Sequence, residues 1–203
     1  MLRCLSGAVL ATLIFTHSAN AIEEPKYRIV QKFRDFEIRR YVPFVVAEIV
    51  VRQSFANAST EGFRRLFQYI SGENRARASI PMAAPVIQTA QPIDMAGPTI
   101  QLSEPSNYLV QFVMPTRLTL ATLPAPSDRL ILLRQVDATT FAAIRYSGTW
   151  SGENYAQNLR VLTASMHREK LEAAGTPLWA RYDPPFVPWF LRRNEILIPV
   201  SAK

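Results

Sequence analysis

Apolar and polar positions alternate along much of the chain, and this alternation predicts a series of short strands. A period of two is typical of strands with one buried face, and unbroken apolar runs are typical of strands buried on both faces. The predicted strands are residues 27–31, 36–41, 44–51, 108–114, 131–136, 141–146, 178–182 and 195–200. Residues 80–87 are extended but interrupted by Pro81 and Pro85, and residues 88–99 are predicted as a surface loop.

Two stretches have helical spacing instead. In the first, four apolar residues at i, i+3, i+4 and i+7 define one face: Phe63, Leu66, Phe67 and Ile70. Asn57 or Ser59 is the predicted N-cap of this helix, Glu61 lies in the predicted first turn, and Ser71-Gly72 ends it. In the second stretch, residues 153–171, the apolar face comprises Tyr155, Leu159, Leu162 and Met166.

The order of these elements is strands, helix, strands, repeated once. Residues 45–67 and 142–162 each contain a strand, a polar link and an amphipathic helix, which indicates an internal duplication. Two amphipathic helices against mainly antiparallel strands give an α+β fold. We therefore predict two duplicated strand-helix-strand halves within one domain.

The first 21 residues have the pattern of an export signal. Arg3 gives a positive start, residues 8–15 are an apolar run, and Ala19-Asn20-Ala21 matches an A-x-A cleavage site. Cleavage after Ala21 would leave residues 22–203 as one domain, in the periplasm or secreted. The apolar run is too short for a membrane span, and no second long apolar stretch follows, so we predict no transmembrane segment in the mature protein.

Composition excludes several classes of site. Cys4, the only cysteine, lies in the predicted signal, and His167 is the only histidine after it. The mature chain therefore has no disulfide and no multi-His metal centre, and a Ser-His-Asp triad is disfavoured. The net charge of +7 is scattered, with no run of five basic residues, which argues against nucleic acid and leaves room for an anionic ligand, membrane surface or partner.

A stiff, aromatic loop precedes the last strand. Pro184, Pro185 and Pro188 fix the backbone, so residues 183–193 form neither a helix nor a central strand. Four aromatic residues lie on or beside it: Tyr182, Phe186, Trp189 and Phe190. Two interpretations stay open, namely the rim of an apolar pocket and a plug at the bottom of a core.

Five motifs, in order, give the chain a family resemblance. They are Phe36-Glu37-Ile38-Arg39-Arg40-Tyr41, Tyr69-Ile70-Ser71-Gly72-Glu73-Asn74, Ile80-Pro81-Met82-Ala83-Ala84-Pro85-Val86, Leu123-Pro124-Ala125-Pro126-Ser127-Asp128 and the loop Tyr182–Glu195. With these motifs the chain resembles the SOUL/heme-binding protein family from about Tyr27 to Val200. The resemblance implies a distorted eight-stranded antiparallel barrel with two helices and two similar halves. It also implies a tetrapyrrole in a hydrophobic cleft beside the first helix, closed by the C-terminal loop.

The resemblance also implies candidate heme-binding residues. Phe63, Phe67 and Tyr182 match cleft positions of the heme-binding branch, and Met82 lies close to the same region. Basic positions of that branch, suited to propionates, are Thr60 and Gln68 here, with Arg64 and Arg65 nearby. The family's second branch has an axial histidine where this chain has Arg40, and a guanidinium cannot ligate iron. The leading hypothesis is an exported, non-enzymatic protein that binds heme or a related porphyrin as a ligand, with Phe63, Phe67, Met82, Tyr182 and Arg64 at the site.

Each of these residues also has a structural interpretation. Phe63 and Phe67 could be core, Met82 could fill a gap, and Tyr182 could bond a backbone carbonyl. His167 is better explained as a solvated side chain near a helix end than as a ligand. Arg192 and Arg193 either pair with propionates or hold the loop through Asp183 or Glu195.

Two other functions remain as alternatives. Glu48, a lone carboxylate in an apolar strand, could act as a base with Tyr182 as the acid, which would make the protein a hydrolase or other enzyme. A strand-edge position or a pairing with arginine explains Glu48 equally simply. The aromatic loop could instead be the contact surface of a protein-interaction module.

Overall fold

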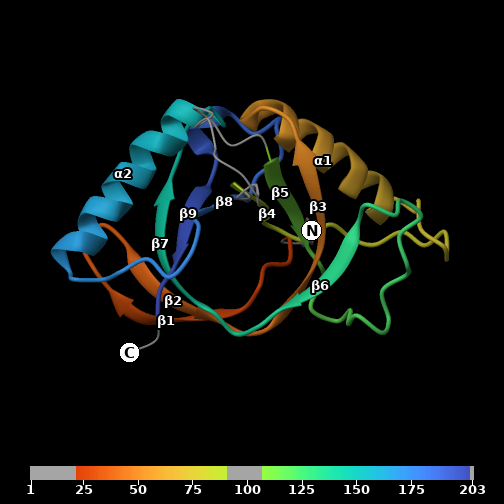
Figure 1. Cartoon of the computed structure of the whole chain (residues 1–203), viewed down its shortest axis with the longest axis horizontal. Helices are drawn as coiled ribbons and strands as arrows, with labels where there is room; N and C mark the ends of the chain where they lie inside the picture. Colours follow the sequence, from red (N-terminus) through yellow and green to blue (C-terminus); the bar gives the residue numbers. More distant parts are fainter. Residues whose placement is uncertain (1–21, 91–106, 202–203) are drawn as a thin grey trace, which may run out of the picture.

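The computed structural model describes residues 22–90 and 107–201 (Figure 1). The predicted signal peptide and residues 91–99 of the predicted loop lie outside the described residues. The strands are β1 Tyr27–Lys32, β2 Glu37–Tyr41, β3 Phe44–Arg52, β4 Val86–Ala90, β5 Asn107–Val113, β6 Leu132–Val136, β7 Thr140–Tyr146, β8 Leu178–Arg181 and β9 Asn194–Pro199. The helices are α1 Phe55–Ile70, α2 Gly152–Arg168 and the short 3-10 helix η1 Trp189–Leu191. The prediction of a loop without helix is therefore wrong at η1, a single turn that starts after Pro188. No helix in this part of the chain has the length and apolar character needed to span a bilayer.

The eight strands predicted from alternation are confirmed to within a few residues, and β4 is an additional strand. Residues 88–90, predicted as loop, belong to β4. The loop was predicted from Gln91-Pro92 and Gly97-Pro98 further along the chain, but Gln88 and Thr89 are buried and bond other segments. Gln88 donates to the carbonyl of Phe55 (2.9 Å), and Thr89 donates to the carbonyl of Pro177 (2.9 Å).

The described strands form one antiparallel sheet of nine strands, in the order β1-β2-β7-β9-β8-β4-β5-β3-β6. The order is symmetric about the β4–β8 pair, since β5-β3-β6 on one side corresponds to β9-β7-β2 on the other. Each half also places a helix after the corresponding strand, α1 after β3 and α2 after β7. Figure 1 shows the sheet curled into half a barrel with both helices on its outside. This confirms the α+β fold with a distorted barrel, whereas the origin of the two halves by duplication stays a prediction.

The sheet has a helix face, which packs against α1 and α2, and an inner face inside the curl. Alternation along β3 sends Ala47 and Ile49 to the core under α1 and Val46 to the inner face. Along β9, Ile196 packs under α2 and Leu197 lies on the inner face. Both faces of the central strands are therefore buried, which explains their nearly continuous apolar sequences.

The α1 helix starts earlier than predicted. Ser54 is its N-cap residue, so the predicted caps Asn57 and Ser59 lie inside the helix and Glu61 lies in the second turn. The polar residues after Ser54 suggested a later start, but tertiary packing of Phe55 against Trp179 (ring centroids 4.7 Å apart) extends the helix toward its N-terminus.

The buried face of α1 is also rotated from the predicted stripe. Small residues lie against the sheet, and at Gly62 an added Cβ would come within 2.6 Å of Val110 Cβ. Leu66 and Ile70 are buried as predicted, but Phe67 is 46% exposed. Glycine and small polar residues do not register in a hydrophobic pattern, although they allow the closest approach of helix and sheet.

The α2 helix follows its prediction. The Ser151 hydroxyl accepts a hydrogen bond from the backbone N–H of Asn154 (3.2 Å), which caps the helix. Leu162 and Met166 are buried in the core under this helix, against which Tyr155, Leu159 and other partly buried apolar residues pack. His167 is exposed in the last turn, as the interpretation of a solvated side chain predicts.

Candidate functional site

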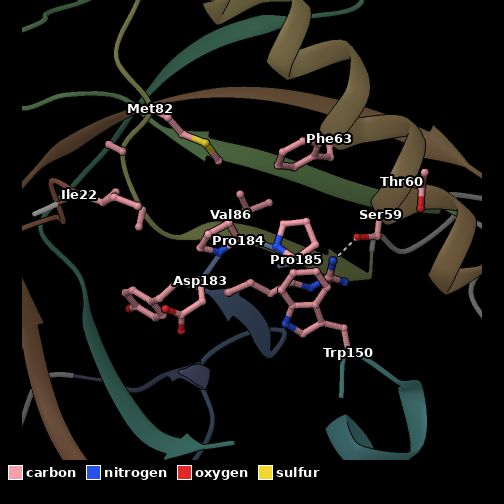
Figure 2. A pocket seen from close by; sticks show the side chains of 14 residues that line it. Ile22, Ser59, Thr60, Phe63, Met82, Val86, Trp150, Asp183, Pro184 and Pro185 are labelled. Carbon is pink, nitrogen blue, oxygen red and sulfur yellow. Dashed lines mark hydrogen bonds between the residues drawn. The ribbon is translucent and has the colours of Figure 1, made fainter. Parts of the chain in front are cut away.

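A cavity of about 390 Å³ lies on the helix face of the sheet. Its walls come from α1, from the segment that leads into β4, and from the start of the C-terminal loop. Figure 2 shows Phe63, Met82, Val86, Pro184 and Pro185 around it. Met82 and Pro185 are themselves exposed, so the cavity opens to solvent on their side.

The apolar character of these walls follows from the sequence. Phe63 extends from the edge of α1, where it packs edge-on against Phe112 of β5 (centroids 5.2 Å apart). Pro184 and Pro185 lack backbone N–H groups, so this part of the loop borders the cavity without unpaired donors. Val86 begins β4 and pairs with Arg181 across the β4–β8 seam. A ligand here would contact carbon surfaces on at least three sides.

One end of the cavity is polar. Arg181 ends β8, and its guanidinium carbon lies 3.9 Å from the ring centroid of Trp179 and 5.1 Å from that of Trp150. The guanidinium donates to the Ser59 hydroxyl of α1 and to the Gln88 side-chain oxygen (3.1 Å). Burial lowers the pKa of Arg181 to about 10, and it therefore stays protonated at neutral pH.

The turn before α2 holds the C-terminal loop in place. The Trp150 indole N–H donates to the Asn194 side-chain oxygen (2.9 Å), and the Gly148 N–H donates to the carbonyl of Trp189 (3.0 Å). The Arg192 guanidinium carbon lies 4.2 Å from the Trp150 ring centroid. Its Nε donates to the carbonyl of Val187 (2.8 Å), so Arg192 holds the loop through backbone carbonyls and not through the predicted partners Asp183 or Glu195.

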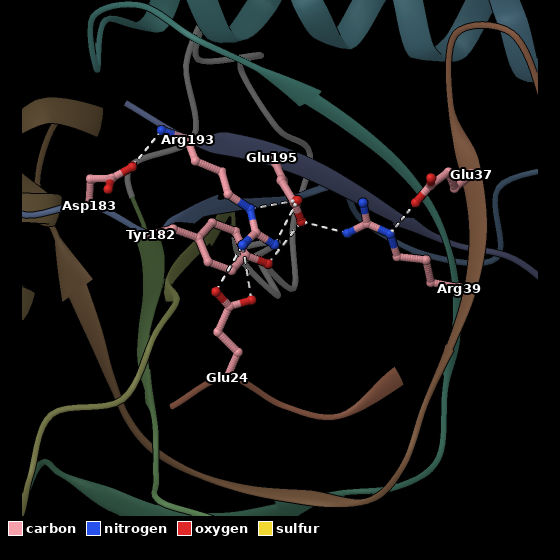
Figure 3. A network of polar contacts seen from close by, with 7 residues as sticks. All are labelled: Glu24, Glu37, Arg39, Tyr182, Asp183, Arg193 and Glu195. Atoms are coloured by element: carbon pink, nitrogen blue, oxygen red, sulfur yellow. Dashed lines mark hydrogen bonds and ion pairs between the residues drawn. The ribbon is translucent and has the colours of Figure 1, made fainter. Parts of the chain in front are cut away.

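On the inner face, a network of charged groups surrounds Glu195, which is fully buried (Figure 3). Its carboxylate accepts hydrogen bonds from Arg39 (2.8 Å), Arg193 (3.0 Å) and the Tyr182 hydroxyl (2.8 Å). Arg193 also donates to Glu24 (2.8 Å), so both arginine side chains of this network are paired with carboxylates. Burial, followed by the negative charge of Glu195, raises the pKa of Tyr182 well above its ordinary value.

The same network closes the base of the C-terminal loop. The Arg193 backbone N–H donates to the Asp183 carboxylate (2.5 Å), and the Tyr182 N–H donates to the Arg193 carbonyl (3.2 Å). The contacts of Arg193 with Asp183 and Glu195 confirm that it holds the loop. Tyr182 joins the two regions, since its ring borders the cavity and its hydroxyl belongs to the network.

The structure brings three of the five predicted site residues together. Phe63, Met82 and Tyr182 border the cavity. Phe67 stacks on Phe63 (5.8 Å between centroids, 10° between planes) but borders a separate surface depression at the end of α1. Arg64 is exposed and donates to Glu61 (2.8 Å), so it does not border the cavity either. Both residues lie on the part of α1 that the rotated buried face turns to solvent.

Most of the candidate iron-ligating atoms at this cavity are already engaged: the Asp183 carboxylate, on the lining, accepts a hydrogen bond from the Arg193 backbone N–H. The Tyr182 hydroxyl is engaged by Glu195 and stays protonated, and His167 is in the last turn of α2. Arg40 is an exposed residue of β2. Met82, which is 38% exposed, supplies the one thioether on the walls in the described part of the chain. The lining therefore fits the flat apolar face of a macrocycle better than it fits a metal-ligand set.

The proposed acid–base pair of an enzyme is engaged elsewhere. Glu48 accepts two hydrogen bonds from Arg134 (2.9 Å each) and one from Gln111 (2.7 Å), which confirms its pairing with an arginine. An edge position is wrong for Glu48, because β3 lies between β5 and β6. The Tyr182 hydroxyl donates to Glu195 instead of Glu48.

Of the four aromatic residues of the loop, one fits a predicted role and three fit neither the rim nor the plug. Tyr182 is buried and borders the cavity, as a residue at a pocket rim would. Phe186, Trp189 and Phe190 are 83%, 57% and 58% exposed, so a plug of the core is wrong for all three. The sequence reasoning missed Arg181, although strand alternation places it on the same face as Trp179.

Comparison with known proteins gives a family and a fold. The sequence profile of the SOUL heme-binding protein family matches residues 22–199. Heme-binding protein 1 of Xenopus tropicalis is 29% identical over 163 residues, which cover 79% of this chain and 81% of that protein. The crystal structure of the EcmrR C-terminal domain superimposes with a TM-score of 0.57 at 12% identity, over 87% of this chain and 99% of that one. A hydrolase from Listeria innocua superimposes with a TM-score of 0.51 at 10% identity, over 90% of this chain and 94% of that one. At such identities these two structures show the fold alone.

Proposed function

The chain belongs to the SOUL heme-binding protein family, and on this premise we propose that it holds heme or a related tetrapyrrole in the cavity beside α1. The observation that supports this site is the apolar cavity of about 390 Å³ between Phe63, Val86 and the Pro184-Pro185 loop. Its volume lies within the range of roughly 300–1,000 Å³ typical of small-molecule sites. The relative named for heme binding covers four-fifths of this chain at 29% identity.

The residues present fit a porphyrin bound through its faces. Phe63, Val86 and Pro184 offer apolar surface, and burying such surface contributes about 25 cal/mol per Å². Met82 is the thioether available to iron on these walls within the described residues. Heme would be the ligand carried by the protein and not a catalytic group, and the engagement of Glu48 by Arg134 supports binding without turnover.

Two phenylalanines of α1 test the location of the site. Phe63 borders the cavity, whereas its stacking partner Phe67 faces solvent, so the same truncation at the two positions separates the cavity from the helix surface. Hemin titration followed in the Soret region should show saturable binding. We expect Phe63→Ala to weaken it about 10- to 100-fold, the effect of losing a buried aromatic contact. Phe67→Ala should change it less than about threefold.

The outcomes test separately whether a heme site exists and where it lies. An unaltered protein that shows no saturable change with hemin up to the solubility limit has no heme site, and the proposal is then wrong. Binding that survives Phe63→Ala but is lost in Phe67→Ala would move the site to the other face of α1. Far-ultraviolet circular dichroism of both variants checks that each is folded.

We also propose that the protein is exported and that cleavage follows Ala21. The support is the A-x-A motif after a short apolar run. Ile22 borders the cavity, so cleavage would place the new α-amino group at its wall. The intact mass of the protein recovered from the periplasm or medium gives the cleavage point, and a protein that stays in the cytoplasm with residues 1–21 attached would contradict export.

A further inference from the structure

Arg181 is a cation with neutral hydrogen-bond partners at the polar end of the cavity. Its guanidinium stacks 3.9 Å from the centroid of Trp179, while its N–H groups reach Ser59 on α1 and Gln88 on β4. Ser59 and Gln88 are neutral. Within residues 22–90 and 107–201, no carboxylate lies within ion-pair distance of Arg181.

A second cation lies close by, also with neutral partners. Arg192 stacks on Trp150, the same indole that Arg181 approaches at 5.1 Å. Its guanidinium donates to the carbonyls of Val187 (2.8 Å) and Pro185 (2.6 Å). The positive charge of Arg192 adds to burial in lowering the pKa of Arg181, so the two charges act on each other.

Such an arrangement is costly unless an anion completes it. Removing a cation from water is unfavourable, and stacking on indole rings recovers part of the loss. A guanidinium has five N–H donors in a fork that matches a carboxylate, and the hydrogen bonds to Ser59 and Gln88 use two of them. The strand places this fork at an apolar cavity, where a charge-assisted hydrogen bond is strongest.

We propose that Arg181 binds a carboxylate of the ligand, so that the cavity selects flat apolar molecules that carry an acid group. This inference rests on the proposed function, and it assigns the polar contact to β8 and not to the α1 arginines suggested by the resemblance. Arg64 is engaged by Glu61 at 2.8 Å, and Arg65 is engaged by Asp128. Among the described side chains that line the cavity, Arg181 is thus the cationic one that an anionic ligand would meet.

The alternative is a purely structural role. Arg181 joins α1 to β4 through Ser59 and Gln88, and a ligand could occupy the cavity without touching it. The two roles differ in what they do to ligand preference. A structural arginine affects acidic and neutral ligands equally, whereas a carboxylate-binding arginine affects the acidic ligand alone.

The test compares protoporphyrin IX with its dimethyl ester, which has the same macrocycle without the two charges. Both are titrated at one detergent concentration against the full chain, Arg181→Met and Arg168→Met, and binding is followed by porphyrin fluorescence. Arg168 is the matched control, because it is an exposed arginine on α2 that pairs with Asp35 (3.0 Å). The substitution Arg168→Met removes the same net charge as Arg181→Met and leaves the cavity unchanged.

We expect the unaltered protein to bind the acid about 10- to 100-fold more tightly than the ester, the range of a charge-assisted hydrogen bond. Arg181→Met should lose this preference, because its affinity for the acid falls while its affinity for the ester stays the same. Arg168→Met should keep the preference. Equal affinity of the unaltered protein for acid and ester overturns the inference, as does an equal loss of both in Arg181→Met. If neither porphyrin binds the unaltered protein, the proposed function itself fails. Should Arg181→Met not fold, Arg181→Gln and the acid-to-ester ratio of the unaltered protein decide the question.

Discussion

Buried and partly buried arginines on the two faces of this sheet have different surroundings. On the inner face, Arg39 contacts Glu37 (2.9 Å) and Glu195 (2.8 Å), and Arg193 contacts Glu195 (3.0 Å) and Glu24 (2.8 Å). On the helix face, Arg181 has a serine, a glutamine and two indole rings around it. The first set of charges is balanced by the protein, and the second is not.

This difference separates charges that hold the fold from a charge available to a ligand. The inner network joins β2, β9, the N-terminal segment and the base of the C-terminal loop, as Figure 3 shows, and both of its arginines are already paired with carboxylates. Arg181 lies at the edge of a cavity with neutral partners. Proximity to the cavity alone does not separate structural residues from ligand-binding ones, since Tyr182 borders the cavity and yet belongs to the network.

The largest expected loss of unfolding free energy comes from removing the Glu195 carboxylate at the centre of the inner network. Glu195→Gln keeps the size of the side chain but leaves Arg39 and Arg193 partly unbalanced inside the protein. Breaking a buried ion pair by removing one partner costs about 3–5 kcal/mol of unfolding free energy. Urea denaturation of both proteins measures this loss.

Glu61→Gln is the matched control for that experiment. It makes the same chemical change in a pair on the α1 surface, where Arg64 is 57% exposed, and should cost less than about 1 kcal/mol. Equal, small losses in both variants would show that the inner network is not a structural element, and the comparison of the two faces would then lose its basis.

A smaller loss of stability is expected from a substitution at the contact between α1 and β5. Gly62→Ala gains up to about 1 kcal/mol of helix propensity, but its Cβ would lie 2.6 Å from Val110 Cβ, and overpacking of this kind costs about 1–3 kcal/mol. We expect a net loss of stability and weaker porphyrin binding, since α1 is a wall of the cavity. The inner network should be unaffected.

Gly152→Ala is the control for a helix glycine with space around it. A Cβ there would meet Phe55 at 3.6 Å, an ordinary contact, so stability should stay the same or rise. Combining Gly62→Ala with Val110→Ala should recover stability relative to the sum of the single changes. Strict additivity in thermal or urea unfolding would mean that the close approach does not position α1.

The architecture was largely predictable because it follows from long-range patterns. Alternation located the eight predicted strands, and helical spacing located both helices, since these periods reflect which face is buried. The rotation of α1 was not predictable from the same pattern. Its contact surface includes Ala58, Ser59 and Gly62, which add little hydrophobicity but allow close packing, and this moved Phe67 to the surface.

The site was predictable only in its apolar part. Phe63, Met82 and Tyr182 were singled out through the family resemblance, and the cavity brings them together. Arg181 was missed because an arginine at a strand end usually faces solvent, and only the neighbouring helix and tryptophans show that it is enclosed. The network around Glu195 joins residues up to 169 positions apart, which no local pattern encodes.

The comparison of faces also predicts how little Arg181 contributes to stability. Arg181→Met removes a cation whose partners are neutral, so the unfolding free energy should change by less than about 1 kcal/mol. Arg39→Met removes a cation from between two carboxylates and should cost about 3–5 kcal/mol. Both are measured by urea denaturation without ligand. A loss in Arg181→Met as large as that in Arg39→Met would make Arg181 a structural residue.

The smallest expected change is in porphyrin affinity when Met82, the one thioether on the described cavity walls, is substituted. Met82 is 38% exposed, and the phenol of Tyr182 is held by Glu195, so the cavity should recognise the macrocycle and its acid groups more than its metal. Hemin and iron-free protoporphyrin IX should therefore bind within about threefold of each other. Met82→Leu, which conserves volume, should leave both affinities unchanged within that range. Fluorescence and Soret titrations give the two constants. Hemin that binds ten times more tightly than the iron-free ring, and loses this advantage in Met82→Leu, would show that a ligating sulfur and not the unbalanced guanidinium sets the chemistry of the helix face.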